Sequence, residues 1–159
     1  MLNHIPWYIA LFISLPETFL IIKVGLNLFK EDISIKDNLL ISLIVAVFSY
    51  SIRIYLNVYG LHTIATAVLI VILVNFIMRK ALVHSVICVF AGLLIMGVSQ
   101  SVTVPFLLVL LRRSMTDLNF YPWLNIFLFL PSATIVSGAI ILMKKKKIYL
   151  LDLKKYIEG

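Results

Sequence analysis

The amino-acid sequence predicts an all-α membrane protein, a polytopic bundle of about five transmembrane helices followed by a short basic tail. Hydrophobic residues make up 62% of the 159 residues, the mean hydropathy is +1.09, and only 13% of the residues are charged. A soluble domain usually carries about 25% charged residues. Apolar runs of spanning length also recur along the whole chain with short polar segments between them. These observations predict a multi-pass protein of the plasma membrane, whose first partner is the lipid bilayer.

The lengths of the apolar runs define the predicted spans. A hydrocarbon core about 30 Å thick requires roughly 20 helical residues. On this scale the predicted spans are 5–29, 38–57, 61–78, 81–111 and 120–143. We therefore expect a transmembrane domain over residues 1–143 and a cytoplasmic amphipathic tail over 144–159, with no second globular domain between the spans.

Local signals support each span in turn. Trp7 and Tyr8 are typical of the interfacial start of a helix, as is the segment 121–123 before the fifth span. The first span is too long for a signal-peptide core and lacks a preceding basic segment, so we expect it to remain in the mature protein. Residues 57–60 predict a tight turn between the second and third spans.

The fourth span is longer than a helix that crosses the bilayer perpendicularly. We therefore expect either one tilted helix or a helix followed by a re-entrant segment, with Gly97 and Pro105 as places to bend or stop.

The distribution of basic residues predicts the orientation. The cations that fall on one side of a five-span bundle are Lys30, Lys36, Arg79, Lys80 and Lys144–Lys147. The positive-inside rule makes this side cytoplasmic, so the N-terminus is outside and the C-terminus inside. Lys23 can snorkel toward the same side. Arg112 and Arg113 are exceptions, but splitting the fourth span into a hairpin would send the four-lysine run outside.

Two ionisable side chains are predicted to lie within the bilayer. Such groups cost at least about 2.5 kcal/mol at mid-depth and therefore need a partner, a wet cavity or an escape to the interface. Glu17 lies near the middle of the first span, and Arg53 lies toward the outer end of the second. Helical spacing places Arg53 on one face with Ser42, Ala46 and Ser49. Glu17 and Arg53 therefore either join the first two helices, or Arg53 snorkels outward while Glu17 is protonated.

Small residues predict further helix-packing faces. The fourth span carries a stripe of mostly small residues: Ala81, Ser85, Cys88, Gly92, Met96 and Ser99. The fifth span carries a weaker stripe of Asn125, Ser132 and Ala139. His62, at the start of the third span, shares a face with Thr66 and is either a polar interfacial residue or a ligand-binding or pH-sensing group.

Candidate catalytic chemistry is limited to one pair. His84 and Cys88 are four residues apart on one helix face. A cysteine nucleophile requires at least a thiol beside an imidazole. Membrane endopeptidases that process quorum-sensing peptides use such a pair. No third orienting group or oxyanion donor can be identified, and Cys88 also fits the packing stripe. The three histidines are scattered and carboxylate clusters are missing, so we expect no metal or other cofactor. The cations lack interleaved aromatic residues, so no nucleic-acid partner is expected.

The tail predicts an interaction surface. Its apolar face consists of Tyr149, Leu150, Leu153, Tyr156 and Ile157. Lys154, Lys155 and Glu158 occupy another face. A basic amphipathic segment of this kind lies on the inner leaflet or joins a partner's helix, unless it is a solvated flank of the last span.

Two short motifs carry a resemblance to a known family. The segments Leu15-Pro16-Glu17-Thr18-Phe19-Leu20 and Tyr59-Gly60-Leu61-His62-Thr63 resemble the N-terminal membrane sensor region of Gram-positive histidine kinases. These kinases carry an ATP-binding domain of the gyrase, Hsp90, kinase and MutL type and include relatives of quorum-sensing peptide receptors. The resemblance spans residues 5–143 and implies sensing of an extracellular or membrane signal. The sequence holds no phosphoacceptor-histidine helix and no ATP-binding boxes, so it resembles a detached input domain rather than a kinase.

The sequence therefore predicts a sensor or signal-relay protein that is not an enzyme and acts through another signalling protein. A shift in helix packing would pass through residues 144–158 to that partner, with Glu17, Arg53 and His62 as the residues to test first. A structural subunit of a membrane complex is an alternative, with other subunits as partners. A small transporter or channel component lined by Glu17 and Arg53 is another, and a cysteine peptidase based on Cys88 and His84 is the last. The oligomeric state stays open.

Overall fold

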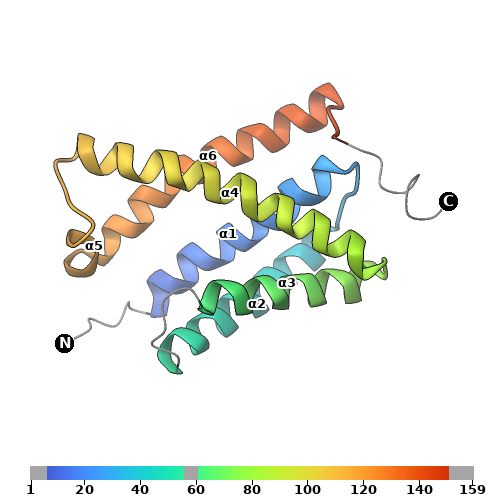
Figure 1. The fold of residues 1–159 in the computed structure, drawn as a ribbon, viewed down its shortest axis with the longest axis horizontal. Helices are drawn as coiled ribbons and strands as arrows, with labels where there is room; N and C mark the ends of the chain where they lie inside the picture. Colours follow the sequence, from blue (N-terminus) through green and yellow to red (C-terminus); the bar gives the residue numbers. More distant parts are fainter. Residues whose placement is uncertain (1–6, 56–60, 151–159) are drawn as a thin grey trace.

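The computed structural model describes residues 7–55 and 61–150, without the side chains of residues 9, 10, 53–55, 61, 62 and 119. All regular structure in these ranges is helical, which confirms the predicted all-α fold. The helices are α1 (Trp7–Leu28), α2 (Ile35–Tyr55), α3 (Leu61–Met78), α4 (Leu82–Leu110), α5 (Asp117–Phe120) and α6 (Pro122–Lys146), shown in Figure 1.

The long helices are suited to a bilayer. Within the described residues, α1, α2, α4 and α6 are long and apolar enough to cross a membrane, and Thr63–Met78 of α3 forms a shorter apolar helix. Their outward surfaces are also apolar: Phe76 on α3 is 79% exposed and Val109 on α4 is 77% exposed. A soluble protein rarely exposes so continuous an apolar surface, because it drives association in water. The protein is therefore a helical membrane bundle with apolar outer faces.

The fourth span is one continuous helix. Helix α4 runs from Leu82 to Leu110 with Pro105 inside it, and no break occurs at Gly97. Of the two expectations for this span, the single long helix is the one observed. Pro105 lies near the end of α4, where a proline removes one helical hydrogen bond without separating two large segments.

Helix α2 begins three residues earlier than the predicted span because the sequence caps it there. The backbone N–H of Asp37 donates to Ser34 Oγ at 3.1 Å, and Ser34 Oγ donates to Asp37 Oδ2 at 2.7 Å. The serine hydroxyl thus satisfies one orphan donor of the first turn, the N–H of Asp37, and the Asp37 carboxylate orients that hydroxyl. Helix α6 extends to Lys146, and the lysines in its last turn complement the negative end of the helix dipole.

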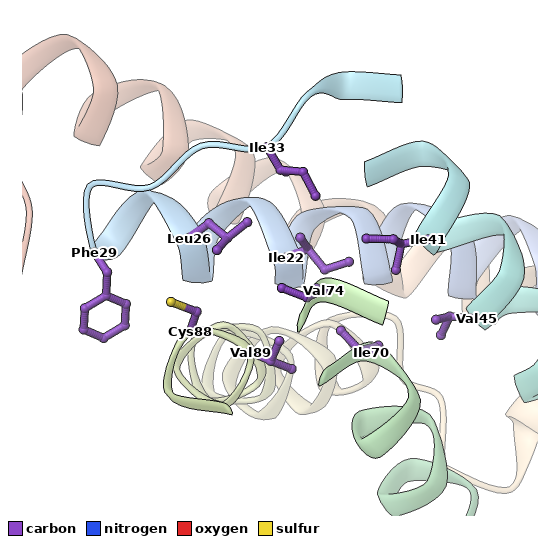
Figure 2. Close-up of a cluster of buried hydrophobic side chains, with 10 residues drawn as sticks. All are labelled: Ile22, Leu26, Phe29, Ile33, Ile41, Val45, Ile70, Val74, Cys88 and Val89. Carbon is purple, nitrogen blue, oxygen red and sulfur yellow. The ribbon is translucent and has the colours of Figure 1, made fainter. Parts of the chain in front are cut away.

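Helix α1 is the centre of the bundle. It packs against α2, α4 and α6, while α3 packs against α2 and α4 (Figure 1). We call the end where α1, α3 and α6 finish and α2 and α4 begin the basic end. Toward it, side chains of four helices and the α1–α2 connection form an apolar cluster (Figure 2). Its members are Ile22, Leu26, Phe29, Ile33, Ile41, Val45, Ile70, Val74, Cys88 and Val89.

Several helices are followed, within two residues, by a basic residue in the left-handed conformation. These residues are Lys30, Arg79, Arg112 and Lys147, with φ of 61°, 50°, 51° and 51°. After α1, the N–H of Glu31 donates to the Leu26 carbonyl at 3.0 Å and the N–H of Lys30 donates to the Asn27 carbonyl at 3.2 Å. This is the Schellman pattern, in which glycine is usual. A lysine or arginine adopts the left-handed conformation less readily than glycine, but its positive charge interacts favourably with the negative end of the helix dipole.

Candidate functional site

Helices α1 and α4 cross in backbone contact. A Cβ atom added at Gly25 would lie 2.1 Å from the Cys88 carbonyl oxygen, and one added at Gly92 would lie 2.1 Å from the Ile21 carbonyl oxygen. No side chain fits at such distances, so both positions require glycine. The small-residue stripe of α4 faces this crossing, and Ser85, Cys88, Gly92 and Met96 are all buried.

His84 and Cys88 both lie inside this packed region. Cys88 is 1% exposed, and its sulfur lies among the apolar side chains beside Leu26 and Phe29 (Figure 2). His84 is buried on the same side of α4. A thiol enclosed in this way packs as a small apolar group and has no open surface from which to reach a substrate. Within the described residues, no group of three His, Cys, Asp or Glu side chains could hold a metal ion.

Farther along the same crossing, Glu17 contacts α4. Gln100 Nε2 donates a hydrogen bond to Glu17 Oε1 at 2.7 Å, and the pair is partly buried. Gln100 was not singled out from the sequence. The available signal was that Gln100 is the only carboxamide, and that no Asp, Glu, Lys or Arg occurs, in 82–110. A lone amide in an apolar span needs a polar partner on a neighbouring helix.

A second polar contact extends this region to α6. The hydroxyl groups of Thr103 on α4 and Ser132 on α6 are hydrogen-bonded, and Ser132 is fully buried. We call Glu17, Gln100, Thr103 and Ser132 the polar layer. The three helices that supply it are those with an internal proline among the described helices: Pro16, Pro105 and Pro131. Each proline removes a helical hydrogen bond, so these helices bend more easily than α2 or α3.

The small polar face of α2 turns toward α1. Ser42, Ala46 and Ser49 are buried, and Asn38 Nδ2 donates to the Phe19 carbonyl at 3.1 Å. Asn38 was missed in the sequence, although it lies one turn before Ser42 on the same face. The Arg53 side chain and that of His62 lie outside the described residues, so the Glu17–Arg53 contact stays a prediction. Gln100 is a described partner of Glu17.

At the basic end, Asp32 joins α1 to α6. Lys23 Nζ lies 2.6 Å from Asp32 Oδ1, and Lys144 Nζ lies 2.9 Å from Asp32 Oδ2. Lys23 Nζ also donates to the Ile33 carbonyl at 3.0 Å, because the 29–34 segment folds back along α1 and places Ile33 beside Ile22 and Leu26 (Figure 2). Lys23, expected to snorkel, is thus paired within the protein and only 12% exposed.

The charge state of Asp32 follows from these neighbours. Partial burial by itself would raise the pKa of Asp32. The hydrogen bonds and positive charges of Lys23 and Lys144 outweigh that effect, so the pKa of Asp32 lies below its ordinary value of 3.8. Asp32 is therefore a carboxylate at neutral pH, and its two ion pairs are present there.

Further contacts tie the end of α1 to the rest of the basic end. The N–H of Leu150 donates to the Leu28 carbonyl at 2.8 Å, which places the segment after α6 against the last turn of α1. The buried Glu31 carboxylate lies 3.5 Å from Lys80 Nζ, between α3 and α4. Of the predicted tail surface, Tyr149 and Leu150 are described and exposed. Leu153, Tyr156 and Ile157 lie outside the described residues.

Comparison of the chain with protein-family models, with curated proteins and with solved structures finds no match.

Proposed function

We propose that this protein is a membrane-embedded relay that passes a change in helix packing to a partner protein through the segment after α6. The observation that carries the proposal is the pair of attachments made by α1. The first attachment is the Glu17–Gln100 hydrogen bond to α4. The second is at the basic end, where Asp32 pairs with Lys144 of α6 and the Leu28 carbonyl accepts from the N–H of Leu150. A displacement of α1 at the polar layer therefore has a physical route to the tail.

The glycine crossing supports a pivot mechanism. Gly25 and Gly92 hold the two backbones in contact, so α1 cannot separate from α4 there without breaking the bundle. Glu17 lies eight residues from Gly25, about 12 Å along the helix. A signal that lengthens or breaks the Glu17–Gln100 contact would tilt α1 about the crossing and shift Leu28 and Asp32 in the opposite direction. Such a signal acts only if it binds the two packings with different affinity.

The resemblance to sensor regions of histidine kinases supplies the expected partner. In those kinases the catalytic part follows the last span on the cytoplasmic side. We propose that the basic end is cytoplasmic and that a kinase or response regulator receives the signal at residues 144–158. The run of lysines at the end of α6 supports this orientation.

Photo-crosslinking in native membranes tests the relay. A photo-reactive residue replaces Leu153 in the tail or, as a matched control, the exposed Tyr121 at the opposite end. The relay predicts capture of a kinase or regulator at Leu153 only, and Gln100→Leu should change the yield of that capture. Capture of the same integral subunits at both positions would support a structural role instead. No capture at either position would overturn the relay.

One observation favours a second candidate, a small transporter or channel component. The polar layer lies where α1, α4 and α6 meet, and polar groups at such a place can line an ion path. Liposomes containing the protein would then show a proton or ion flux that Glu17→Gln abolishes. An unchanged flux in Glu17→Gln, or none in the wild type, would exclude this candidate. The burial of Cys88 does not favour the peptidase.

A further inference from the structure

Lys144 differs from the lysines that follow it. All four lysines are exposed, but Lys144 Nζ also lies 2.9 Å from Asp32 Oδ2. The N–H of Leu150 bonds to the Leu28 carbonyl on the same side of the bundle. One carboxylate and one backbone hydrogen bond therefore hold the segment after α6 against the end of α1.

This attachment is weak by construction. Asp32 is 57% exposed and Lys144 is 46% exposed, so water screens their attraction. Exposed ion pairs of this kind bias an equilibrium by about fivefold or less. The attached arrangement is then favoured but easily displaced, as a regulated contact must be.

Lipid phosphate groups can compete with Asp32 for Lys144. The lysine run ends a membrane helix, where the phosphate groups of lipids are within reach of a lysine side chain. The attraction of an anionic leaflet for one nearby lysine shifts a binding equilibrium by about fivefold. This shift is comparable with the one that Asp32 supplies. Lys30, Lys36 and Arg79 are exposed at the same end, which makes this face of the bundle basic.

We propose that Asp32, Lys144 and Leu150 form a latch that holds residues 144–150 against the end of α1, and that anionic lipid headgroups open it by competing for Lys144. The lipid surface is thus a regulatory partner of the basic end. The value of the latch for signalling rests on the proposed relay, but its opening is measurable with purified protein and without a partner.

The experiment measures the distance between spin labels in lipid nanodiscs. Labels attached through unnatural amino acids at the exposed Ile35 and Leu150 leave Cys88 intact. The discs contain phosphatidylcholine alone or phosphatidylcholine mixed with phosphatidylglycerol. Two variants test the ion pair, Asp32→Asn and Lys144→Gln. Their matched controls are Asp37→Asn, which removes an acid bonded to Ser34 instead, and Lys146→Gln on the exposed part of the run.

The latch predicts a short distance for the wild type in phosphatidylcholine and an open fraction about fivefold larger with phosphatidylglycerol. Asp32→Asn should be open in both lipids, Lys144→Gln should lose the lipid response, and the controls should behave as wild type. A wild-type distance that ignores lipid composition, or a closed Asp32→Asn variant, would overturn the proposal. Opening by soluble glycerol phosphate in phosphatidylcholine discs would overturn the role of the lipid surface. A latch that opens in a protein that captures no partner would reject the relay alone.

Discussion

The contact between α1 and α4 has two regions that differ in chemistry. Near Gly25 and Gly92 the two backbones touch, and apolar side chains surround them. Near Glu17 and Gln100 the helices are joined by a hydrogen bond between these two side chains. The glycine region sets how closely the helices approach and has no room for adjustment. The polar region sets their alignment through a bond that a ligand, a proton or a substitution can change.

Replacing the glycine of α4 should have the largest effect. Gly92→Leu places a side chain where the Ile21 carbonyl lies, so we expect a loss of about 3 kcal/mol or failure to form the bundle. Gly97→Leu is the matched control, because a Cβ added at Gly97 would meet no atom within 4 Å beyond its chain neighbours and the nearby backbone of its own helix. Denaturant titration in detergent micelles measures both. Equal stability of the two variants would show that the backbone contact is not required.

Removing the polar contact should cost less. Gln100→Leu leaves the Glu17 carboxyl without its described donor, and we expect a loss of about 1 kcal/mol. Ser101→Ala, at the next position and exposed, should change stability by less than about 0.5 kcal/mol. Glu17→Leu combined with Gln100→Leu completes a double-mutant cycle. Strictly additive losses in that cycle would mean that the two side chains do not interact.

The thiol of Cys88 reports whether the glycine region is closed. We expect Cys88 to resist a membrane-permeant maleimide in the folded protein and to react after unfolding, because its sulfur is packed beside Leu26. A cysteine introduced at the exposed Val98 supplies the positive control. Cys88→Ala should destabilise the protein by about 1 kcal/mol through the small cavity that it leaves. Rapid labelling of Cys88 would reopen the peptidase hypothesis.

Acid should have the smallest effect on the stability of the bundle. Because the folded-state pKa of Asp32 is lowered, its contribution is present above its ordinary pKa of 3.8 and is lost as the pH falls below that value toward the folded-state pKa. Since Asp32 is largely exposed, we expect a loss below about 1 kcal/mol. Unfolding curves between neutral pH and the acid limit should show this component in the wild type. The same component in Asp32→Asn would assign it to another carboxyl group.

The sequence predicts the helices and their faces better than the contacts between them. Apolar runs set the approximate bounds of the helices, and helical spacing alone grouped Ser85, Cys88 and Gly92 on one side of α4. The Glu17–Gln100 contact depends on the register of two helices whose crossing is set elsewhere, at Gly25 and Gly92. The Asp32–Lys144 contact depends on the 29–34 segment folding back along α1, and no local pattern in the sequence indicates that path.

The separation of Glu17 and Gln100 along the chain has a consequence for biosynthesis. The two residues lie 83 positions apart. At a synthesis rate of about 5–20 residues per second, the helix carrying Glu17 waits roughly 4–17 s before its partner is made. During that interval the Glu17 carboxyl lacks the hydrogen bond from Gln100. Helix α1 therefore reaches its final place only after α4, which is made later, has arrived.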